Sequence, residues 1–357
     1  MTESLQHGST IGILGGGQLG RMLSVAASRL GFRCHIFEPG PNPPAGHVAD
    51  EIPTASYDDK DALKAFAENV DVITYEFENI PTQALDILES SCPIRPGREA
   101  LRTSQDRLIE KDFLSGLGLR TAPYADVPDT QALQDALSTI GAPSILKTRR
   151  FGYDGKGQAR IMALSDADQA FADMAGSPAI LEGFIDFQRE VSIIAARSID
   201  GGVSVYAPGE NVHKDGILRT TTVPARLTPA QRSDAVLIAA RILNALDYVG
   251  VMGVELFVTA GGLVVNEIAP RVHNSGHWTQ NGCCVDQFEQ HIRAVVGWPL
   301  GDGERHSDVV MENLIGHDMN RVPELSQAGD VALHLYGKTD VKEGRKMGHF
   351  NRVVSKT

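Results

Sequence analysis

The chain has 357 residues, 42% of them hydrophobic and 22% charged, so it is long enough for two or three domains with a core in each. Its net charge of −12 argues against a nucleic-acid or anionic-membrane partner. No apolar run approaches the roughly 20 residues that cross a bilayer, the first ten residues lack the features of a secretory signal, and the four cysteines form no C-x-x-C pair, so we expect a reduced, cytoplasmic, soluble protein.

The first hundred residues alternate between apolar runs and amphipathic segments. The expected strands are 10–16, 34–39 and 70–77, and the expected helices are 18–30 and 61–69. Because crossovers between parallel strands are right-handed, this alternation predicts a doubly wound parallel sheet.

The first turn of this region spells G-x-G-x-x-G with Gly15, Gly17 and Gly20. Glu38 ends the second strand 18 residues after Gly20, close to where a dinucleotide-binding fold places its ribose-binding acid. The alternative is a strand-to-helix turn without a dinucleotide, whose helix N-terminus could still hold another anion. The stretch alone leaves both interpretations open.

The rest of the chain divides into three further parts. A helix is expected from about Ser104, whose side chain can cap it, to Ser115, followed by glycines and a proline that indicate a boundary. A small α/β region comes next, then a strand-rich region with a long helix near 229–246, and finally short strands and turns. The fold expected is α/β and multidomain, with a β-rich C-terminal part and domains at 1–103, 104–186, 187–305 and 306–357.

Two acids in an apolar hairpin sequence are placed symmetrically about Gly261. A hairpin centred there sets Glu255 opposite Glu267 on one face, with Asn266 adjacent. Two such carboxylates repel unless a cation joins them, and Mg²⁺ prefers carboxylate, phosphate and water oxygens. The pattern favours a magnesium site, and the alternative is a pair of edge acids that face water.

A lysine and a glycine-rich loop stand together at 144–158. Lys147 ends an apolar strand, and the loop that follows contains three glycines and Lys156. A lysine supplies a point charge for phosphate, and glycines let backbone N–H groups approach phosphate oxygens. The spelling is not that of the P-loop, and the alternative is a mobile basic hairpin.

Glu182 and Glu190 flank a short linker at 183–185. The linker backbone can present N–H and C=O groups to an adenine edge, and Glu190 can accept ribose hydroxyls. Taken alone, the two acids are better explained as surface residues at strand ends.

Lysine, glycine loop, acid-flanked linker and paired acids follow one another in an order that resembles the ATP-grasp superfamily. Seven blocks between about residues 10 and 354 resemble the 5-(carboxyamino)imidazole ribonucleotide synthase family: GGGQLGRM, TYEFENIP, SQDRLIEKDFL, KTRRFGYDGKGQ, ENVHKDGILRTTTVPA, NEIAPRVHNSGHWT and GRKMGHF. The resemblance implies an ATP-grasp fold and a ligase of purine biosynthesis. It also implies a homodimer.

The chemistry implied by this resemblance uses ATP, Mg²⁺ and bicarbonate. Bicarbonate is a poor electrophile, and its phosphorylation to carboxyphosphate creates a leaving group. The carboxyl group, as CO₂ or directly from carboxyphosphate, then passes to the exocyclic amine of aminoimidazole ribonucleotide. The protein supplies charge neutralisation, positioning and water exclusion.

The resemblance also implies the residues of the site. Around ATP it places Arg107, Lys147, Tyr153, Asp154, Gly155, Lys156, Gly157, Gln158, Glu182, Gly183, Phe184, Ile185, Glu190, His213, Asn266 and Glu267. The implied magnesium ligands are Glu255 and Glu267, and the implied catalytic residues are Arg271, His273, Asn274 and Lys147.

For the ribonucleotide, the implied residues are Gln18, Leu19, Glu76, Tyr153, Asp154, Arg271, Lys338 and Arg345. Glu76 is expected on the ribose hydroxyls, and Lys338 and Arg345 on the 5′-phosphate. With the ATP residues more than a hundred positions downstream, the glycine turn is expected to form a wall of the ribonucleotide pocket, where its glycines allow close approach.

Other functions fit parts of the pattern. A formate-dependent glycinamide ribonucleotide transformylase shares the ATP-grasp core, an NAD-dependent oxidoreductase rests on the glycine turn, and a nucleotide sensor would bind ATP without ribonucleotide-stimulated hydrolysis. His273 and His277 stand four residues apart, as zinc ligands can, but a third ligand is missing.

Overall fold

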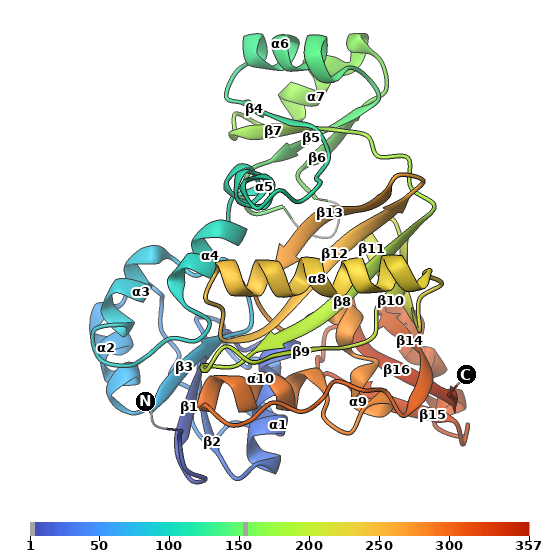
Figure 1. Ribbon diagram of the computed structural model, residues 1–357. Helices are drawn as coiled ribbons and strands as arrows, with labels where there is room; N and C mark the ends of the chain where they lie inside the picture. Colours follow the sequence, from blue (N-terminus) through green and yellow to red (C-terminus); the bar gives the residue numbers. More distant parts are fainter. Residues whose placement is uncertain (1–3, 153–155, 357) are drawn as a thin grey trace.

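Three β-sheets organise residues 4–152 and 156–356, the part of the chain that the computed structural model describes (Figure 1). A three-stranded sheet forms the N-terminal part, a four-stranded sheet forms the small domain at the top of Figure 1, and a nine-stranded sheet runs through the rest. The predicted α/β architecture is confirmed.

The N-terminal sheet is parallel, with the strand order β2-β1-β3. Its elements are β1 (Thr10–Leu14), α1 (Gln18–Arg29), β2 (Arg33–Phe37), α2 (Lys60–Glu68), β3 (Val72–Tyr75), α3 (Thr82–Leu88) and α4 (Arg98–Ser104). The chain leaves the central strand β1 in one direction for β2 and then passes to its other side for β3, which is the doubly wound pattern that the sequence predicts. Ligands of such sheets bind beyond the carboxyl ends of the strands, where the glycine turn lies.

The helix α5 (Arg107–Gly116), which follows the N-terminal domain, begins later than the sequence predicts. Asp106 is its N-cap and accepts a hydrogen bond from the backbone N–H of Leu108 at 3.0 Å. Ser104 ends α4 instead, and its hydroxyl donates to the carbonyl of Ala100 at 2.9 Å. The prediction that Ser104 caps this helix is wrong, because its hydroxyl is used within α4 and the stronger cap stands two residues later.

The small domain has a sheet of strand order β4-β7-β5-β6. Its elements are β4 (Tyr124–Val127), α6 (Thr130–Ile140), β5 (Ser144–Thr148), β6 (Gln158–Ile161), α7 (Ala167–Asp173) and β7 (Ala179–Gly183). Its two helices cover one face of the sheet and bury a core of their own, which includes Leu133, Leu146 and Leu181 (Figure 1). The sheet therefore presents its other face, and the end of β5, to the rest of the molecule.

The large sheet has the strand order β13-β12-β8-β10-β11-β14-β16-β15, with β9 paired to β8. Its strands are β8 (Arg189–Arg197), β9 (Val203–Val205), β10 (Gly209–Lys214), β11 (Ile217–Val223), β12 (Gly250–Thr259), β13 (Gly262–Ala269), β14 (Ser307–Ile315), β15 (Val331–Leu335) and β16 (Lys346–Ser355). Its helices are α8 (Pro229–Ala245), α9 (Thr279–Gly282), α10 (Gln287–Val296) and α11 (Val322–Leu325). Because β14 pairs with β11, the C-terminal strands continue this sheet.

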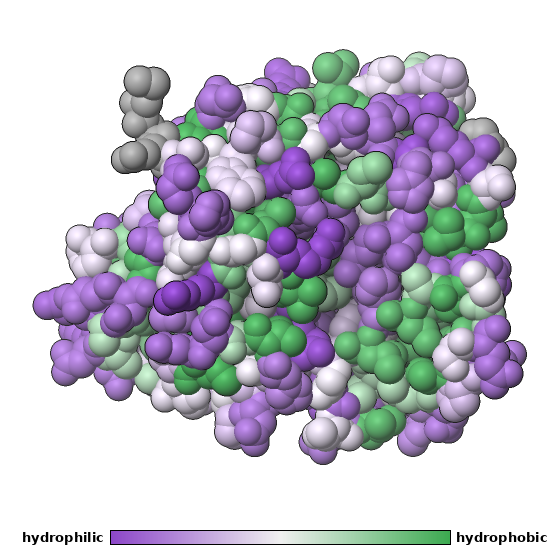
Figure 2. Space-filling view, turned by 90° about the horizontal axis from the view of Figure 1, so that it is seen from below, coloured by the Kyte–Doolittle hydropathy of each residue, from purple (hydrophilic) through white to green (hydrophobic). Residues whose placement is uncertain are grey.

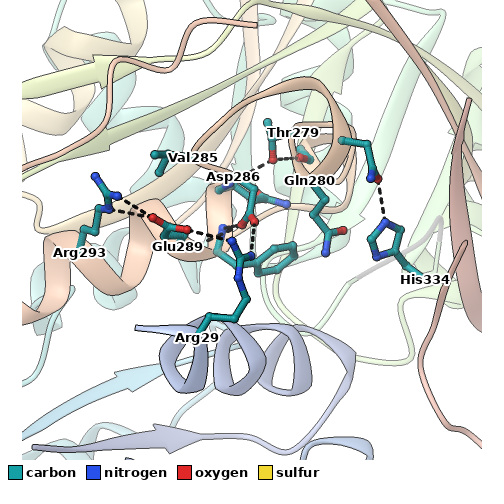
Figure 3. A network of polar contacts seen from close by, with 12 residues as sticks. Arg29, Thr279, Gln280, Val285, Asp286, Glu289, Arg293 and His334 are labelled. Atoms are coloured by element: carbon teal, nitrogen blue, oxygen red, sulfur yellow. Dashed lines mark hydrogen bonds and ion pairs between the residues drawn. The ribbon is translucent and has the colours of Figure 1, made fainter. Parts of the chain in front are cut away.

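The N-terminal domain and the large sheet share one hydrophobic core. Leu23 of α1 and Ile292 of α10 are fully buried in the same cluster. Arg29 of α1 pairs with Asp286, the N-cap of α10, at 3.3 Å and with Glu289 of α10 at 3.2 Å (Figure 3). The two parts are thus joined by apolar burial and by charge.

The surface seen in Figure 2 is mainly hydrophilic, with apolar residues in separate groups. This agrees with the acidic composition of the chain. Among the described residues, no helix combines the length and apolar character needed to cross a membrane.

Candidate active site

One cavity of about 870 Å³ is lined by strands of the small-domain sheet and the large sheet, by the loop after β3, and by residues of α1, α4 and α5. The predicted site residues that line it are Gln18, Leu19, Glu76, Arg107, Lys147, Lys156, Gln158, Phe184, Glu190, His213, Glu255, Asn266, Glu267, Arg271, His273 and Asn274. Residues from position 18 to position 274 thus meet around one space.

The other predicted residues lie elsewhere. Gly157, Glu182, Gly183, Ile185, Lys338 and Arg345 are not part of the cavity lining. Tyr153, Asp154 and Gly155 lie outside the described residues.

The hairpin of β12 and β13 sets Glu255 directly opposite Glu267, as the sequence predicts. The turn is tighter than expected, because Thr259 pairs with Gly262 and the hairpin is therefore centred one half-residue before Gly261. A β-bulge at Asn266 adds the residue that restores the predicted pairing. The pairing is confirmed, and its cause is the bulge rather than a symmetric turn.

The two opposed carboxylates carry unbalanced negative charge. Burial and the neighbouring charge of Glu267 raise the pKa of Glu255. Burial would raise the pKa of Glu267 as well, but Arg107, whose Nη1 lies 2.9 Å from Oε2 of Glu267, holds that pKa below its ordinary value. A divalent cation between the two carboxylates would relieve their repulsion, and hard oxygen donors suit Mg²⁺. The residues present therefore fit this ion.

Lys147 lies at the end of β5, where its ammonium reaches the cavity. Its Nζ lies 3.0 Å from Oε2 of Glu182, which is buried and also lies 3.5 Å from Lys111. Burial would raise the pKa of Glu182, but the charges of Lys147 and Lys111 hold it below its ordinary value. Glu182 thus holds the ammonium of Lys147 in position but does not itself line the cavity.

An apolar slot adjoins these charges. The rings of Phe187 and Phe257 stack with centroids 4.7 Å apart, and both line the cavity with Phe184 and Ile145. Beside the slot, Nδ1 of His213 lies 2.6 Å from Oε2 of Glu190. A flat, apolar opening with polar groups at its rim suits a heteroaromatic base and its sugar.

Arg271, His273 and Asn274 follow β13 and face the same cavity. Nε of Arg271 donates to Oε2 of Glu78 at 2.6 Å. Nε2 of His273 lies 3.5 Å from Oε1 of Glu255, and burial, then the charge of Arg271, lowers the pKa of His273 to about 3. Both polar side-chain atoms of Asn274 are buried without a hydrogen-bond partner among the described residues. Such an amide is costly to leave unpaired, so it fits a ligand site.

The glycine turn after β1 is occupied by the chain's own carboxylates. Glu76 accepts hydrogen bonds from the N–H groups of Gly17 and Gly20, the second at 2.7 Å. Glu38 accepts from the N–H of Gly16 at 2.7 Å. A Cβ at Gly17 would come within 2.4 Å of Oε1 of Glu76, so the glycine makes room for this carboxylate.

These contacts bear on both interpretations of the turn. Within the structure, the group packed closely against the glycines is the carboxylate of Glu76. A dinucleotide pyrophosphate would have to take the N–H groups that Glu38 and Glu76 already use. Gln18 and Leu19, which line the cavity, are the part of the turn that faces a ligand.

The C-terminal strands reach this end of the cavity. Nζ of Lys338 donates to Oε1 of Gln18 at 2.7 Å and to the carbonyl of Lys346 at 2.8 Å. Burial, then the charge of Arg345, lowers the pKa of Lys338 to about 8. Lys338 therefore stands behind Gln18, while Lys346 lines the cavity itself.

The sequence reasoning missed several cavity residues, above all Glu78, Glu110 and Lys346. Burial and the charge of Glu267 raise the pKa of Glu110 to about 8, and its Oε1 accepts from the N–H of Ile268 at 2.6 Å. Glu78 and Lys346 lie within the blocks TYEFENIP and GRKMGHF, close to the predicted residues Glu76 and Arg345. The resemblance therefore identified the right segments but not every residue in them that lines the cavity.

His273 and His277 do not converge on a common point. Nδ1 of His273 lies 2.8 Å from Oγ of Ser275, and Nδ1 of His277 lies 3.0 Å from Nε2 of Gln287. The ring of His277 stacks on that of His349 at 4.5 Å. In the described part of the chain, no three His, Cys, Asp or Glu side chains group as metal ligands.

Three family models match successive parts of the chain. They are a ribonucleotide synthetase preATP-grasp domain at residues 8–105, an ATP-grasp domain at residues 112–288 and a phosphoribosylaminoimidazole carboxylase C-terminal domain at residues 309–357. Together with the fold and the cavity, these matches define an ATP-grasp ligase.

Several known proteins are similar to this chain over nearly their whole length. The N5-carboxyaminoimidazole ribonucleotide synthase of Brucella melitensis is 53% identical, over 99% of this chain and 99% of its own. The Staphylococcus aureus synthetase, solved with ADP, is 37% identical at a TM-score of 0.94, over 99% of this chain and 95% of its own. The Aspergillus clavatus enzyme, solved with ADP and 5-aminoimidazole ribonucleotide, is 30% identical at a TM-score of 0.92, over 98% of this chain and 94% of its own.

The chain belongs to the N5-carboxyaminoimidazole ribonucleotide synthase family, whose other chemical name is 5-(carboxyamino)imidazole ribonucleotide synthase. It is an ATP-dependent ligase. The family predicted from the seven sequence blocks is confirmed, and the formate-dependent and oxidoreductase alternatives are set aside.

Proposed function

We propose that this chain uses ATP to phosphorylate bicarbonate and transfers the carboxyl group to the exocyclic amine of 5-aminoimidazole ribonucleotide. The observation that carries the proposal is the single cavity, which has phosphate-binding and metal-binding residues at one end and the glycine turn with Glu76 at the other. Homologues solved with ADP and with the ribonucleotide support both ligands. Each step below names what the residues of this chain do.

At the nucleotide end, the apolar slot with Phe187 and Phe257 receives the adenine ring. Glu190, held at 2.6 Å from His213, accepts ribose hydroxyls. Lys147 and Arg107 neutralise the phosphates, which weakens the electrostatic repulsion between ATP and the incoming bicarbonate anion.

Mg²⁺, when bound with ATP, neutralises charge on the transferring phosphoryl group. Glu255 and Glu267 would hold it, because they face each other across the hairpin and lie beside the phosphate-binding lysine. Arg107 pairs with Glu267 and lines the same cavity, so its guanidinium is also within the space that would hold the phosphates.

A bicarbonate oxygen forms a bond to the γ-phosphorus, and the bond to the ADP oxygen breaks. The product is carboxyphosphate, whose negative oxygens meet the guanidinium of Arg271 and the unpaired amide of Asn274. In the second step the amine nitrogen of the ribonucleotide forms a bond to the carboxyl carbon. The bond from that carbon to the phosphate oxygen breaks, and the amine releases a proton.

The ribonucleotide lies at the glycine-turn end. Gln18 and Leu19 face it, and Glu76 keeps lone pairs for the ribose hydroxyls while its backbone contacts fix its position. Lys338 and Arg345 supply positive charge for the 5′-phosphate, with Lys346 at the cavity wall as a third candidate.

The test measures ADP release with ATP and Mg²⁺ while bicarbonate and aminoimidazole ribonucleotide are each omitted in turn. We expect full release only with both present. Release that needs formate instead of bicarbonate, or that ignores the ribonucleotide, would contradict the proposal. Loss of release on chelation of Mg²⁺, restored by added Mg²⁺, tests the metal.

Three further expectations belong to this proposal. The chain acts in the cytoplasm, it is a homodimer, and its domains divide near residues 103, 186 and 305. Sedimentation velocity tests the dimer, and limited proteolysis near the three boundaries tests the division.

A further inference from the structure

The segment from Arg271 to Asn274 carries proposed catalytic residues but leaves the sheet before they begin. The ladder between β12 and β13 ends at the pair Gly253 and Ala269. Beyond it, regular strand pairing no longer fixes the backbone, so another contact must set where His273 and Asn274 point.

Gln287, the first residue of α10, makes that contact. Its Oε1 accepts from the backbone N–H of His273 at 2.9 Å, and its Nε2 donates to the backbone carbonyl of His273 at 2.8 Å. The same Nε2 lies 3.0 Å from Nδ1 of His277. The glutamine side chain is fully buried, so this two-point pairing takes the place of a missing strand neighbour.

The start of α10 is itself firmly held. Asp286 caps it through the N–H of Phe288 at 2.8 Å, and Arg29 of α1 pairs with Asp286, as Figure 3 shows. The backbone N–H of Gln287 donates to Oγ1 of Thr279 at 3.0 Å. A side chain on such an anchored turn has little freedom and can fix a neighbouring segment.

The segment held by Gln287 leads directly to the reacting groups. His273 carries a ring whose Nδ1 lies 2.8 Å from Oγ of Ser275 and whose Nε2 lies 3.5 Å from Glu255. The next residue is Asn274, which lines the cavity and whose two polar side-chain atoms are buried and unpaired among the described residues. Gln287 itself does not line the cavity.

We propose that Gln287 is a positioning residue that sets His273 and Asn274 against carboxyphosphate, so that the carboxyl group passes to the ribonucleotide rather than to water. This inference rests on the proposed function. The phosphates of ATP are held by Lys147 and Arg107 on other elements, so a loosened segment should spoil transfer more than nucleotide binding.

The chain offers a matched control three residues along the same helix. Gln290 is also fully buried, and it pairs with the backbone of Gly301 in the same two-point way, at 2.8 Å to the N–H and 2.9 Å to the carbonyl. Gln290 holds a loop that does not line the cavity. Gln287→Met and Gln290→Met therefore remove equivalent pairs of hydrogen bonds. The first pair holds a segment that lines the cavity, and the second holds a loop that does not.

The experiment measures kcat, KM for ATP, and ADP released per ribonucleotide carboxylated in the wild-type chain and both variants. For Gln287→Met we expect kcat for carboxylation to fall roughly 10- to 100-fold and KM for ATP to change by less than about twofold. The number of ADP molecules released per ribonucleotide carboxylated should rise above one. For Gln290→Met we expect the wild-type values of kcat and of this number, although both variants should lower the unfolding midpoint by a similar amount. Equal kinetics in the two variants would overturn the inference.

Hydrogen exchange gives a readout that does not need turnover. Gln287→Met should speed exchange in the peptide around His273, and Gln290→Met should speed it around Gly301. If the wild-type chain fails to carboxylate, the proposed function falls, while unchanged exchange around His273 overturns the pairing separately. If Gln287→Met does not fold, Gly276→Ala takes its place, because a Cβ there would come within 2.5 Å of Oε1 of Gln287 and displace the amide.

Discussion

The two ends of the cavity both bring a pair of carboxylates to a turn, and they treat negative charge in opposite ways. At the glycine turn, Glu38 and Glu76 accept hydrogen bonds from backbone N–H groups at the start of α1. At the β12–β13 hairpin, Glu255 and Glu267 face each other across the two strands, and Glu267 pairs with Arg107 rather than with backbone N–H groups. The first pair is held by the backbone of the turn, whereas the second is the pair that we propose to hold Mg²⁺.

This contrast separates acids that the backbone of a turn holds in place from acids that we propose to hold a cation. A carboxylate whose oxygens are taken by backbone N–H groups lowers the cost of the turn that it closes. A carboxylate pair with unbalanced charge costs stability until a ligand arrives, which is typical of binding sites. The predictions that follow test this contrast from its strongest consequence to its weakest.

Glu267→Gln should reduce ADP formation on the order of 10³-fold, because it removes one of the two proposed magnesium carboxylates. The fold should be intact, since the amide has nearly the size of the carboxylate and its oxygen can still accept a hydrogen bond from Arg107. ADP release under saturating substrates measures the effect, and circular dichroism checks the fold. Glu312→Gln, on β14 of the same sheet and paired with Arg321, is the control and should keep near-normal turnover. Near-normal turnover of Glu267→Gln itself would remove the metal assignment.

Lys338→Ala should raise KM for the ribonucleotide by about 10- to 100-fold, because it removes a proposed positive charge for the 5′-phosphate and the hydrogen bond that holds Gln18 at the cavity wall. KM for ATP should change by less than about twofold, because the variant alters the glycine-turn end of the cavity alone. Initial rates with each substrate varied in turn separate the two constants. Equal shifts in both would show that the two ends do not bind different ligands.

The affinity for the ribonucleotide should also depend on pH through Lys338. Its pKa is lowered to about 8 by burial and then by Arg345, so the ammonium is cationic below pH 8 and loses its proton as the pH rises through that value. We expect the dissociation constant to rise by about tenfold per pH unit above pH 8 in the wild-type chain. Titration calorimetry from pH 7 to pH 9.5 measures it, and Lys338→Ala should give a flatter profile. A wild-type profile that is flat over this range would contradict the assignment.

Glu38→Ala should cost about 1 kcal/mol of unfolding free energy, because the N–H of Gly16 loses its acceptor. The expected shift in unfolding midpoint is roughly 2 °C. Turnover should stay within about twofold, since Glu38 does not line the cavity. Differential scanning calorimetry and the ADP assay measure the two effects, and a large loss of activity without a loss of stability would assign Glu38 to the site after all.

Local patterns in the sequence predict a large share of this fold. The alternation of apolar runs predicts the parallel N-terminal sheet, and residue spacing predicts the pairing of Glu255 with Glu267. The bulge at Asn266 shows the limit of spacing, because the turn itself is tighter than a symmetric count suggests. The cap of α5 shows another limit, since both Ser104 and Asp106 are good caps and only the packing selects one.

Contacts between distant segments explain what the sequence does not predict. Glu76 reaches the glycine turn from a strand 56 residues away, and Arg271 meets Glu78 across 193 residues. Gln287 has no motif around it and gains its role from the position of α10. Such roles depend on tertiary arrangement, which residue spacing does not encode.

The ion pairs of the cavity bear on how its ligands are selected. Arg107 is already paired with Glu267. Arg271, which follows β13, is paired with Glu78 of the N-terminal domain. An incoming anion therefore competes with a carboxylate of the protein for each guanidinium. A small anion such as chloride could replace Glu267 as the partner of Arg107 but would leave the carboxylate of Glu267 without a cation. A nucleotide with a bound metal ion would provide phosphate for Arg107 and the metal ion for Glu267. We therefore expect the cavity to bind the magnesium complex of a nucleotide more tightly than either component alone, because only the complex would give both members of the Arg107–Glu267 pair a new partner.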